Sequence, residues 1–89
     1  MPLYARILWI TVPPGEAAAA VVKHREHVRE LRERGTIRHA GAFSDDEGFL
    51  EIFVAKDLHE ATAVVQASPL VEAGQCSWQL REWNEIQDR

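Results

Sequence analysis

His24 is the residue whose type and position favour chemistry most strongly. Apolar residues recur at helical spacing between residues 16 and 34, and His24 stands in the middle of that stripe. The stripe also contains Ala17, Val21, Val28 and Leu31. A neutral imidazole can take or give a proton near neutral pH, so His24 could act as a general base beside a hydrophobic pocket. The alternative is a core histidine bonded to a backbone carbonyl, and the spacing alone favours that alternative.

Arg38 and His39 could contact a substrate from a neighbouring strand. They are adjacent in the sequence, so on a strand one would face the helices and the other the opposite side. An arginine on the helix side would clamp a carboxylate. His39 alternates with Ile37, Gly41 and Phe43, which predicts that it shares their apolar face. The alternative for both residues is a position in the lining or at the rim of the fold.

Glu51 lies between Phe49 and Phe53, on a strand that is otherwise apolar on both faces. It is expected to pair with Arg6 or Arg38 across the sheet, and its alternative role is that of an acid in a pocket.

The aromatic residues could form a wall for a planar substrate. They are Tyr4, Trp9, Trp78 and Trp83, and packing in a core or an interface explains them equally well. His24 and His27 are three apart on a helix and could chelate a metal, but no Cys or Asp accompanies them at ligand spacing, so no metal site is expected. His27 and His59 are expected at the surface.

The elements that must position these residues run strand, helix, strand, strand, helix, strand. Strands are predicted over 4–12, 36–44, 48–55 and 75–86, and helices over 16–34 and 57–67, followed by one short helical turn that begins at Ser68. Gly35 is expected to end the first helix, and Asp57 with Glu60 forms a capping box for the second. This order predicts an α+β, ferredoxin-like β-α-β-β-α-β fold, in which both helices cover one face of a four-stranded antiparallel sheet.

Both faces of the predicted sheet are apolar, although two helices can cover only one. In the first strand Tyr4 and Leu8 point one way, and Ile7 and Trp9 point the other. A second copy of the chain would cover the exposed face most economically, because closed two-fold homodimers are the commonest oligomers. The remaining sides of the first helix carry interleaved charges of opposite sign and are expected to be a solvated face.

Length and composition exclude several classes of protein. The chain has 89 residues, which predicts a single domain spanning 1–89. Its net charge of -4 gives no general attraction to phosphate backbones or anionic lipid, so no nucleic-acid or membrane partner is expected. It has no signal-peptide pattern and no apolar run of about 18 residues. A single cysteine fits a reducing compartment, so a cytoplasmic protein is expected.

Several motifs together resemble the YCII-related family of dimeric α+β barrel proteins. Its first-helix histidine, eleven positions before a glycine, is matched by His24 and Gly35. Its Ala-Gly-Pro-Phe-like strand is matched by residues 40–43, and its Asp-Pro-x-x-x-x-Gly segment by residues 68–74. Muconolactone isomerases are similar in part, through residues 35–39 and the pair 69–70. The resemblance covers residues 4–83 and implies subunits paired sheet to sheet. It also implies a small-molecule pocket between sheet and helices that works without metal or cofactor.

The sequence departs from the family pattern at one functional position. There the helix histidine and the aspartate of the Asp-Pro segment are the proposed acid–base pair. His24 matches the histidine, but Ser68 replaces the aspartate and Ala42 replaces the family proline. A serine cannot hold the charge that would orient an imidazole. Ser68 could instead cap a helix, or donate a hydrogen bond to His24 or to a substrate oxygen. Either another residue partners His24, or the site has become a binding pocket.

The leading hypothesis is a cofactor-independent acid–base enzyme of isomerase, lyase or cyclase type. Its substrate would be a small apolar compound, carboxylated or aromatic, from catabolism or secondary metabolism. His24 would be the base, and Ser68 or Arg38 would hold a substrate oxygen. The other expected contacts to the substrate are His39, Glu51, Tyr4, Trp9 and Trp78. The rival hypotheses are a non-catalytic homodimeric module for ligand binding or assembly, which Ser68 favours, and a cofactor-free oxygenase.

Overall fold

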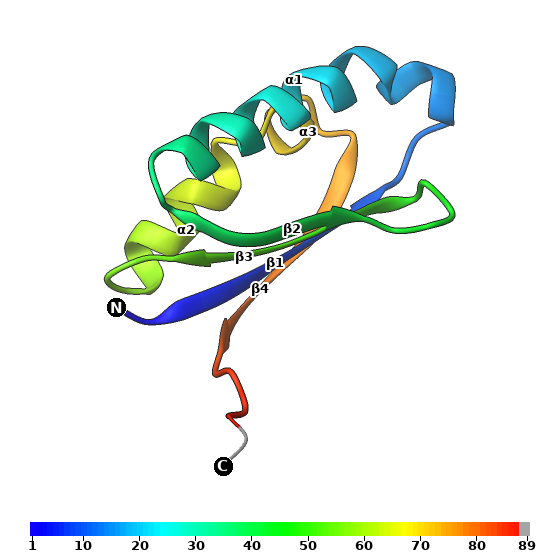
Figure 1. Ribbon diagram of the computed structural model, residues 1–89. Helices are drawn as coiled ribbons and strands as arrows, with labels where there is room; N and C mark the ends of the chain where they lie inside the picture. The colour runs from blue at the N-terminus through cyan, green and yellow to red at the C-terminus, as the bar shows by residue number, and fades with distance from the viewer. Residues whose placement is uncertain (88–89) are drawn as a thin grey trace.

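The computed structural model describes residues 1–87 as four strands and three helices in the predicted order (Figure 1). The elements are β1 (Leu3–Ile10), α1 (Pro14–Glu33), β2 (Ile37–Ala42), β3 (Gly48–Val54), α2 (Leu58–Gln66), α3 (Pro69–Glu72) and β4 (Cys76–Trp83). The ferredoxin-like α+β fold is therefore confirmed. The short helical turn predicted after Ser68 is α3. Within the described part of the chain, no helix is long and apolar enough to cross a membrane.

The four strands form one antiparallel sheet in the order β2-β3-β1-β4, and all the helices lie on the same side of it (Figure 1). The two central strands, β1 and β3, pair closely at the start of β3. A Cβ atom on Gly48 would collide with the Leu8 carbonyl of β1, so only glycine lets the strands approach there. This tight pairing fixes the register that places residues of β1 and β3 opposite one another.

Local capping explains where the helices begin and end. Gly35 follows α1 with φ of +77°, its N–H donates to the Arg32 carbonyl at 3.0 Å, and the Thr36 N–H donates to the Leu31 carbonyl at 2.9 Å. These two bonds satisfy carbonyls that a helix end otherwise leaves free. Asp57 caps α2 by accepting from the Glu60 N–H at 2.9 Å. Both predicted boundaries are confirmed.

The helix-covered face of the sheet holds two apolar clusters. One contains Tyr4, Leu31, Ile37, Phe53, Ala55 and Ala61. The other contains Leu8, Ala17, Phe49 and Leu70. The register pairs Tyr4 with Phe53 in the first cluster, and Leu8 with Phe49 in the second. Between these two pairs the register sets Arg6 opposite Glu51, so two charged residues lie between the clusters.

The other face of the sheet carries no helix. The alternate residues of β1 and β3 point to it, namely Leu3, Ala5, Ile7, Trp9, Leu50, Ile52 and Val54. Trp9 is 41% exposed and Leu50 39% exposed. The predicted division of both strands into two apolar faces is therefore confirmed, and the uncovered face presents large apolar side chains.

Strand β2 departs from the predicted alternation. Ile37 pairs with Phe53 and His39 pairs with the adjacent Ile52, so Arg38 is an extra residue in a β-bulge. Ile37 is consequently buried under the helices, whereas His39 turns to the uncovered face. The prediction that His39 shares a face with Ile37 is wrong, because the bulge adds one residue to the strand and reverses the alternation beyond it.

Candidate functional site

Four polar side chains form one buried hydrogen-bonded chain between the two apolar clusters. Arg6, Glu51, His24 and Ser68 are each at most 1% exposed. The Arg6 Nε donates to Glu51 Oε1 at 2.7 Å. His24 Nε2 lies 2.9 Å from Glu51 Oε2, and His24 Nδ1 lies 2.9 Å from Ser68 Oγ. Strands β1 and β3, helix α1 and the start of α3 thus each supply one member of the chain.

The Glu51 carboxylate is held in its ionised form. Burial acts to raise its pKa, but the hydrogen bond from His24 and the charge of Arg6 outweigh burial and hold that pKa below its ordinary value. An ionised carboxylate only accepts hydrogen bonds, so His24 Nε2 carries a hydrogen and donates it to Glu51. The carboxylate partner of His24 is therefore Glu51, which β3 supplies.

Ser68 completes the network at the other ring nitrogen. It is the N-cap of α3, and its Oγ accepts from the Leu70 N–H at 3.2 Å. Its hydroxyl hydrogen is then free to donate to His24 Nδ1. A His24 ring with a hydrogen on Nε2, with the Ser68 hydroxyl as donor to Nδ1, satisfies the hydrogen bonds of both residues.

Arg6 is anchored from a second side by His27. Its Nη1 donates to the Val64 carbonyl at 3.0 Å and lies 3.3 Å from His27 Nε2. Burial and the charge of Arg6 lower the pKa of His27 to about 4, so the ring is neutral at pH 7 and accepts this bond. His27 is half-buried, and the prediction that it lies at the surface is wrong. Arg6 Nη2 is buried and has no protein partner among the described residues.

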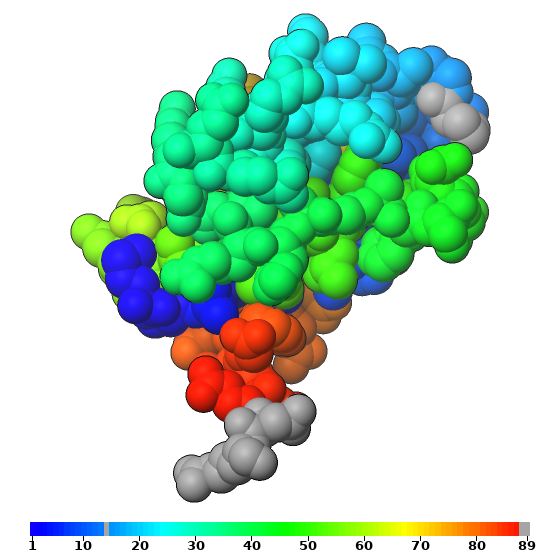
Figure 2. All heavy atoms as spheres, viewed as in Figure 1, coloured from blue at the N-terminus to red at the C-terminus, as the bar shows by residue number. Residues whose placement is uncertain are grey.

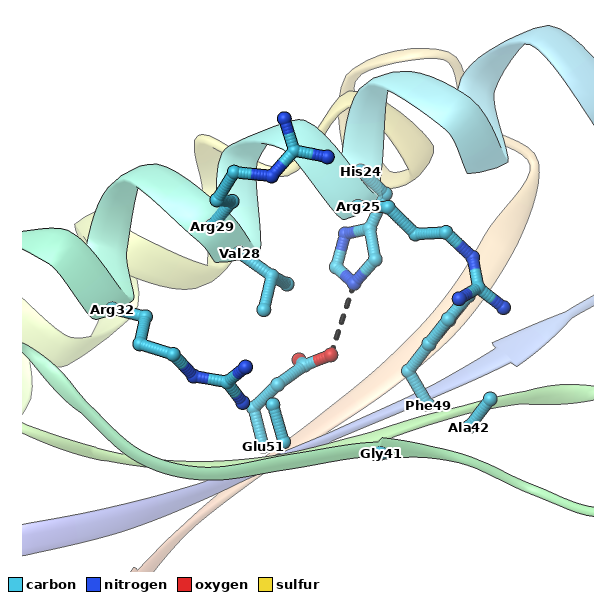
Figure 3. A pocket seen from close by; sticks show the side chains of 10 residues that line it. His24, Arg25, Val28, Arg29, Arg32, Gly41, Ala42, Phe49 and Glu51 are labelled. Carbon is cyan, nitrogen blue, oxygen red and sulfur yellow. Dashed lines mark hydrogen bonds and ion pairs between the residues drawn. The ribbon is translucent and has the colours of Figure 1, made fainter.

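A cavity of about 240 Å³ opens onto Glu51 and His24. It lies between α1 and β2, and its other lining residues are Arg25, Val28, Arg29, Arg32, Ala40, Gly41, Ala42 and Phe49. In Figure 3 the side chains of Arg25 and Arg32 flank the point where the His24 ring meets the Glu51 carboxylate, whereas Arg29 points away. The cavity therefore combines an acid–base pair at its floor with guanidinium groups at its rim.

Sequence reasoning missed the three rim arginines. They are spaced four and three residues apart on α1, which places them on one helical face beside His24. The interleaved charges around them indicated a solvated surface, and all three are indeed exposed. Their spacing next to the histidine was the signal that could have found them. What hid their role is that β2, distant in the sequence, forms the opposite wall.

The structure brings together His24, Glu51 and Ser68, but it places the other expected contact residues elsewhere. Arg38 and His39 are exposed on the edge strand β2. Tyr4 is buried in an apolar cluster, Trp9 lies on the uncovered face, and Trp78 is on the edge strand β4, 39% exposed. None of these five is among the described residues that line the cavity. Over the same residues, no group of three His, Cys, Asp or Glu side chains could hold a metal ion.

Comparisons with known proteins place this chain in a family. No protein-family model matches the sequence. The uncharacterized protein YjpA of Bacillus subtilis, a YCII family member, is 32% identical over 63 residues, which cover 71% of this chain and 74% of YjpA.

Two solved structures share the fold. One is a 5-chloro-2-hydroxyhydroquinone dehydrochlorinase from Burkholderia phenoliruptrix in complex with 2,5-dihydroxybenzoquinone. Its TM-score is 0.66 at 18% identity, over 92% of this chain and 95% of that one. The other is muconolactone isomerase, with a TM-score of 0.78 at 14% identity, over 98% of this chain and 93% of that one. At these identities they establish the fold alone. The similarity to YjpA shows that the chain belongs to the YCII-related family of dimeric α+β barrel proteins.

Proposed function

We propose that this protein is a cofactor-independent acid–base enzyme of isomerase, lyase or cyclase type, acting on a small carboxylated or phenolic compound. The observation that carries the proposal is the buried Glu51–His24 pair at the floor of a cavity with arginines at its rim. A charged pair buried in this way stabilises a fold poorly. A titratable pair that lines a cavity is instead a general signature of a reactive site.

The hydrogen-bond network suggests a role for each member of the pair. Since Nε2 of His24 carries a hydrogen, the imidazole starts as a donor, and the Glu51 carboxylate is the available base. A substrate carbonyl oxygen would replace Glu51 Oε2 as the acceptor from Nε2, and the freed Glu51 oxygen would take a proton from the adjacent carbon. The C–H electron pair would then form an enolate, stabilised by Nε2–H and the rim arginines. Protonation at another carbon completes an isomerisation, and loss of a leaving group completes an elimination.

Two features support this assignment over a binding pocket that has lost its chemistry. The family aspartate is absent, because Ser68 stands in its place, yet Glu51 gives His24 a carboxylate from the opposite side of the ring. Arg6 fixes Glu51 through its other oxygen and so orients it. Two neighbours of this fold are a dehydrochlorinase and an isomerase by name, which fits elimination and isomerisation.

Deuterium exchange tests the proposal without knowledge of the natural substrate. Small carboxylated ketones and hydroxyquinones, including 2,5-dihydroxybenzoquinone, would be incubated with the protein in D2O, and exchange of the acidic C–H would be followed by proton NMR. Glu51→Gln should lower the exchange rate at least about 100-fold, since it removes the base. His24→Gln keeps an N–H donor and should lose less. Glu30→Gln and His59→Gln are matched surface controls.

The pH profile separates the two candidate bases. If Glu51 is the base, the rate stays level down to acidic pH and falls only where the carboxylate, with its lowered pKa, takes up a proton. If His24 is the base, a limb appears between about pH 5 and 8, and His24→Gln becomes the more damaging variant. Absence of exchange above the Glu51→Gln level with every compound would favour the rival function, a ligand-binding or assembly module, for which Ser68 is the supporting observation.

Two further proposals concern the setting of the enzyme. The uncovered apolar face of the sheet supports a homodimer in which a second copy covers Trp9 and Leu50. The single cysteine of the chain, Cys76, supports a cytoplasmic location.

A further inference from the structure

A second hollow adjoins the candidate active site. It measures about 460 Å³ and lies between the first half of α1 and the turn that joins β2 to β3. Its wall is mostly apolar and includes Ile10, Val12, Ala18 and Val21. Figure 2 shows α1, in cyan and blue, meeting the green β2–β3 hairpin on this face of the molecule. The mechanism proposed above makes no use of this space.

The two hollows are adjacent, because they share lining residues. Arg25, Ala42 and Phe49 line both of them. The guanidinium of Arg25 lies 5.6 Å from the centre of the Phe49 ring, and that ring lies 4.6 Å from the His24 ring. A ligand that reached His24 in the first cavity would extend past Phe49 into the second hollow if the exposed Arg25 side chain swings off the ring.

The sizes of the hollows favour one extended ligand. Small-molecule pockets usually measure about 300–1,000 Å³, and the first cavity alone falls below that range. With the second hollow added, the space lies well within it.

The charges at the two ends differ in sign. Arginines surround the first cavity, whereas Asp45, Asp46 and Glu47 stand at the far end of the second hollow. An anion is attracted to the first end and repelled by the second.

We infer that the second hollow binds the apolar tail of the substrate, so that the substrate is an amphiphile with one anionic head and an uncharged hydrocarbon or aryl tail. Arg25, over the Phe49 ring, is the residue at which head and tail meet. This inference rests on the proposed function, because it places the reacting head at Glu51 and His24. It adds the substrate class: a compound with anionic groups at both ends is excluded by the acidic turn.

A series of straight-chain carboxylates tests the inference by binding alone. Butanoate, hexanoate, octanoate and decanoate would be titrated by calorimetry, with octanedioate as the doubly charged compound. The dissociation constant should fall about two- to fourfold for each added methylene until the hollow is filled. Octanedioate should bind more weakly than octanoate. Equal affinity along the series, or tighter binding of octanedioate, would overturn the inference.

A pair of variants with the same substitution locates the tail. Ala18 and Ala19 are both exposed on α1, but only Ala18 lines the second hollow. Ala18→Trp should abolish the gain in affinity with chain length, and Ala19→Trp should leave that gain intact. Equal behaviour of the two variants would place the tail elsewhere, such as on the uncovered sheet face, and would reject the inference.

The outcome is separable from that of the proposed function. Glu51→Gln should keep the chain-length dependence, since the tail does not contact the base. If affinity rises with chain length but no deuterium exchange is observed, the acid–base function is rejected and the tail site stands. If deuterium exchange is observed but affinity does not rise with chain length, only the tail site is rejected.

Discussion

The two faces of the sheet reverse the usual distribution of polar and apolar residues. Under the helices, β1 and β3 bury Arg6 and Glu51 between two apolar clusters. On the uncovered face, the same two strands present an uncharged surface in which Trp9 and Leu50 are about two-fifths exposed. An ordinary two-layer domain would place charge on the open side and keep it out of the core.

The difference between the two faces separates residues needed for the candidate site from residues needed for the proposed partner surface. Removing a charged pair from water costs several kcal/mol per ion, so Arg6 and Glu51 are not explained by stability. Under the proposed function they hold a carboxylate next to His24. Exposure of the apolar face to water gives no stability either, and the proposed homodimer would cover that face. The predictions below test this contrast, in order of their expected effect on the free energy of unfolding.

Removal of Arg6 should give the largest loss. Arg6→Met leaves the Glu51 carboxylate buried with His24 as its remaining partner, so the free energy of unfolding should fall by about 3–5 kcal/mol in urea titrations. The double variant Arg6→Met/Glu51→Leu removes both charges and should recover most of that loss. If Arg6→Met alone lowers the free energy of unfolding by less than about 1 kcal/mol, Arg6 and Glu51 are not isolated from water.

Acid should destabilise the helix-covered face through His27. Because its pKa is lowered to about 4 in the folded protein, the unfolded chain binds the proton first, and stability falls as pH drops from 6.5 to 4. Water screens this half-exposed ring, so the loss should be about 1–2 kcal/mol rather than the full value of the shift. Glu51, with its lowered pKa, extends the loss to lower pH. Chemical denaturation at several pH values measures it, and His27→Gln should flatten the curve between pH 6.5 and 4.

Two helix caps should differ in function as well as in their contribution to stability. Asp57→Ala removes the exposed cap of α2 and should lower the free energy of unfolding by about 1 kcal/mol, whereas Ser68→Ala removes the cap of α3 and the buried bond to His24 and should lower it by about 1–2 kcal/mol. Only Ser68 also contacts His24, so only Ser68→Ala should slow deuterium exchange. Equal exchange rates in the two variants would reduce Ser68 to a structural cap.

A charge on the uncovered face should leave the single chain intact and prevent its association. Ile7→Arg should change the free energy of unfolding of the monomer by less than about 0.5 kcal/mol, since no helix covers this position. In sedimentation equilibrium the wild type should be dimeric and Ile7→Arg monomeric. Ala19→Arg, on the helix surface, is the control and should remain dimeric. A monomeric wild type would remove the proposed partner surface.

Sequence reasoning succeeded wherever neighbours along the chain decide the outcome. The Gly35 helix end, the Asp57 cap and the two faces of β1 follow from residues a few positions apart, and all three were predictable. The same reasoning failed at β2, where a bulge reversed the face of His39. Nothing in the local pattern of residues 36–44 marks the extra residue, because a bulge is defined against its partner strand.

The same limit of reasoning from local sequence applies to the candidate site. His24 was recognisable as a candidate from its place on an apolar helix stripe. The replacement of the family aspartate by Ser68 was also visible in the sequence. Which carboxylate replaces that aspartate depends on the docking of α1 over the middle of β3, 27 residues along the chain. Hydrogen bonds of about 3 Å between such distant residues follow from sheet register and helix packing together. Local sequence was therefore enough to name the histidine, and the fold as a whole chose Glu51 as its partner and set the arginines around them.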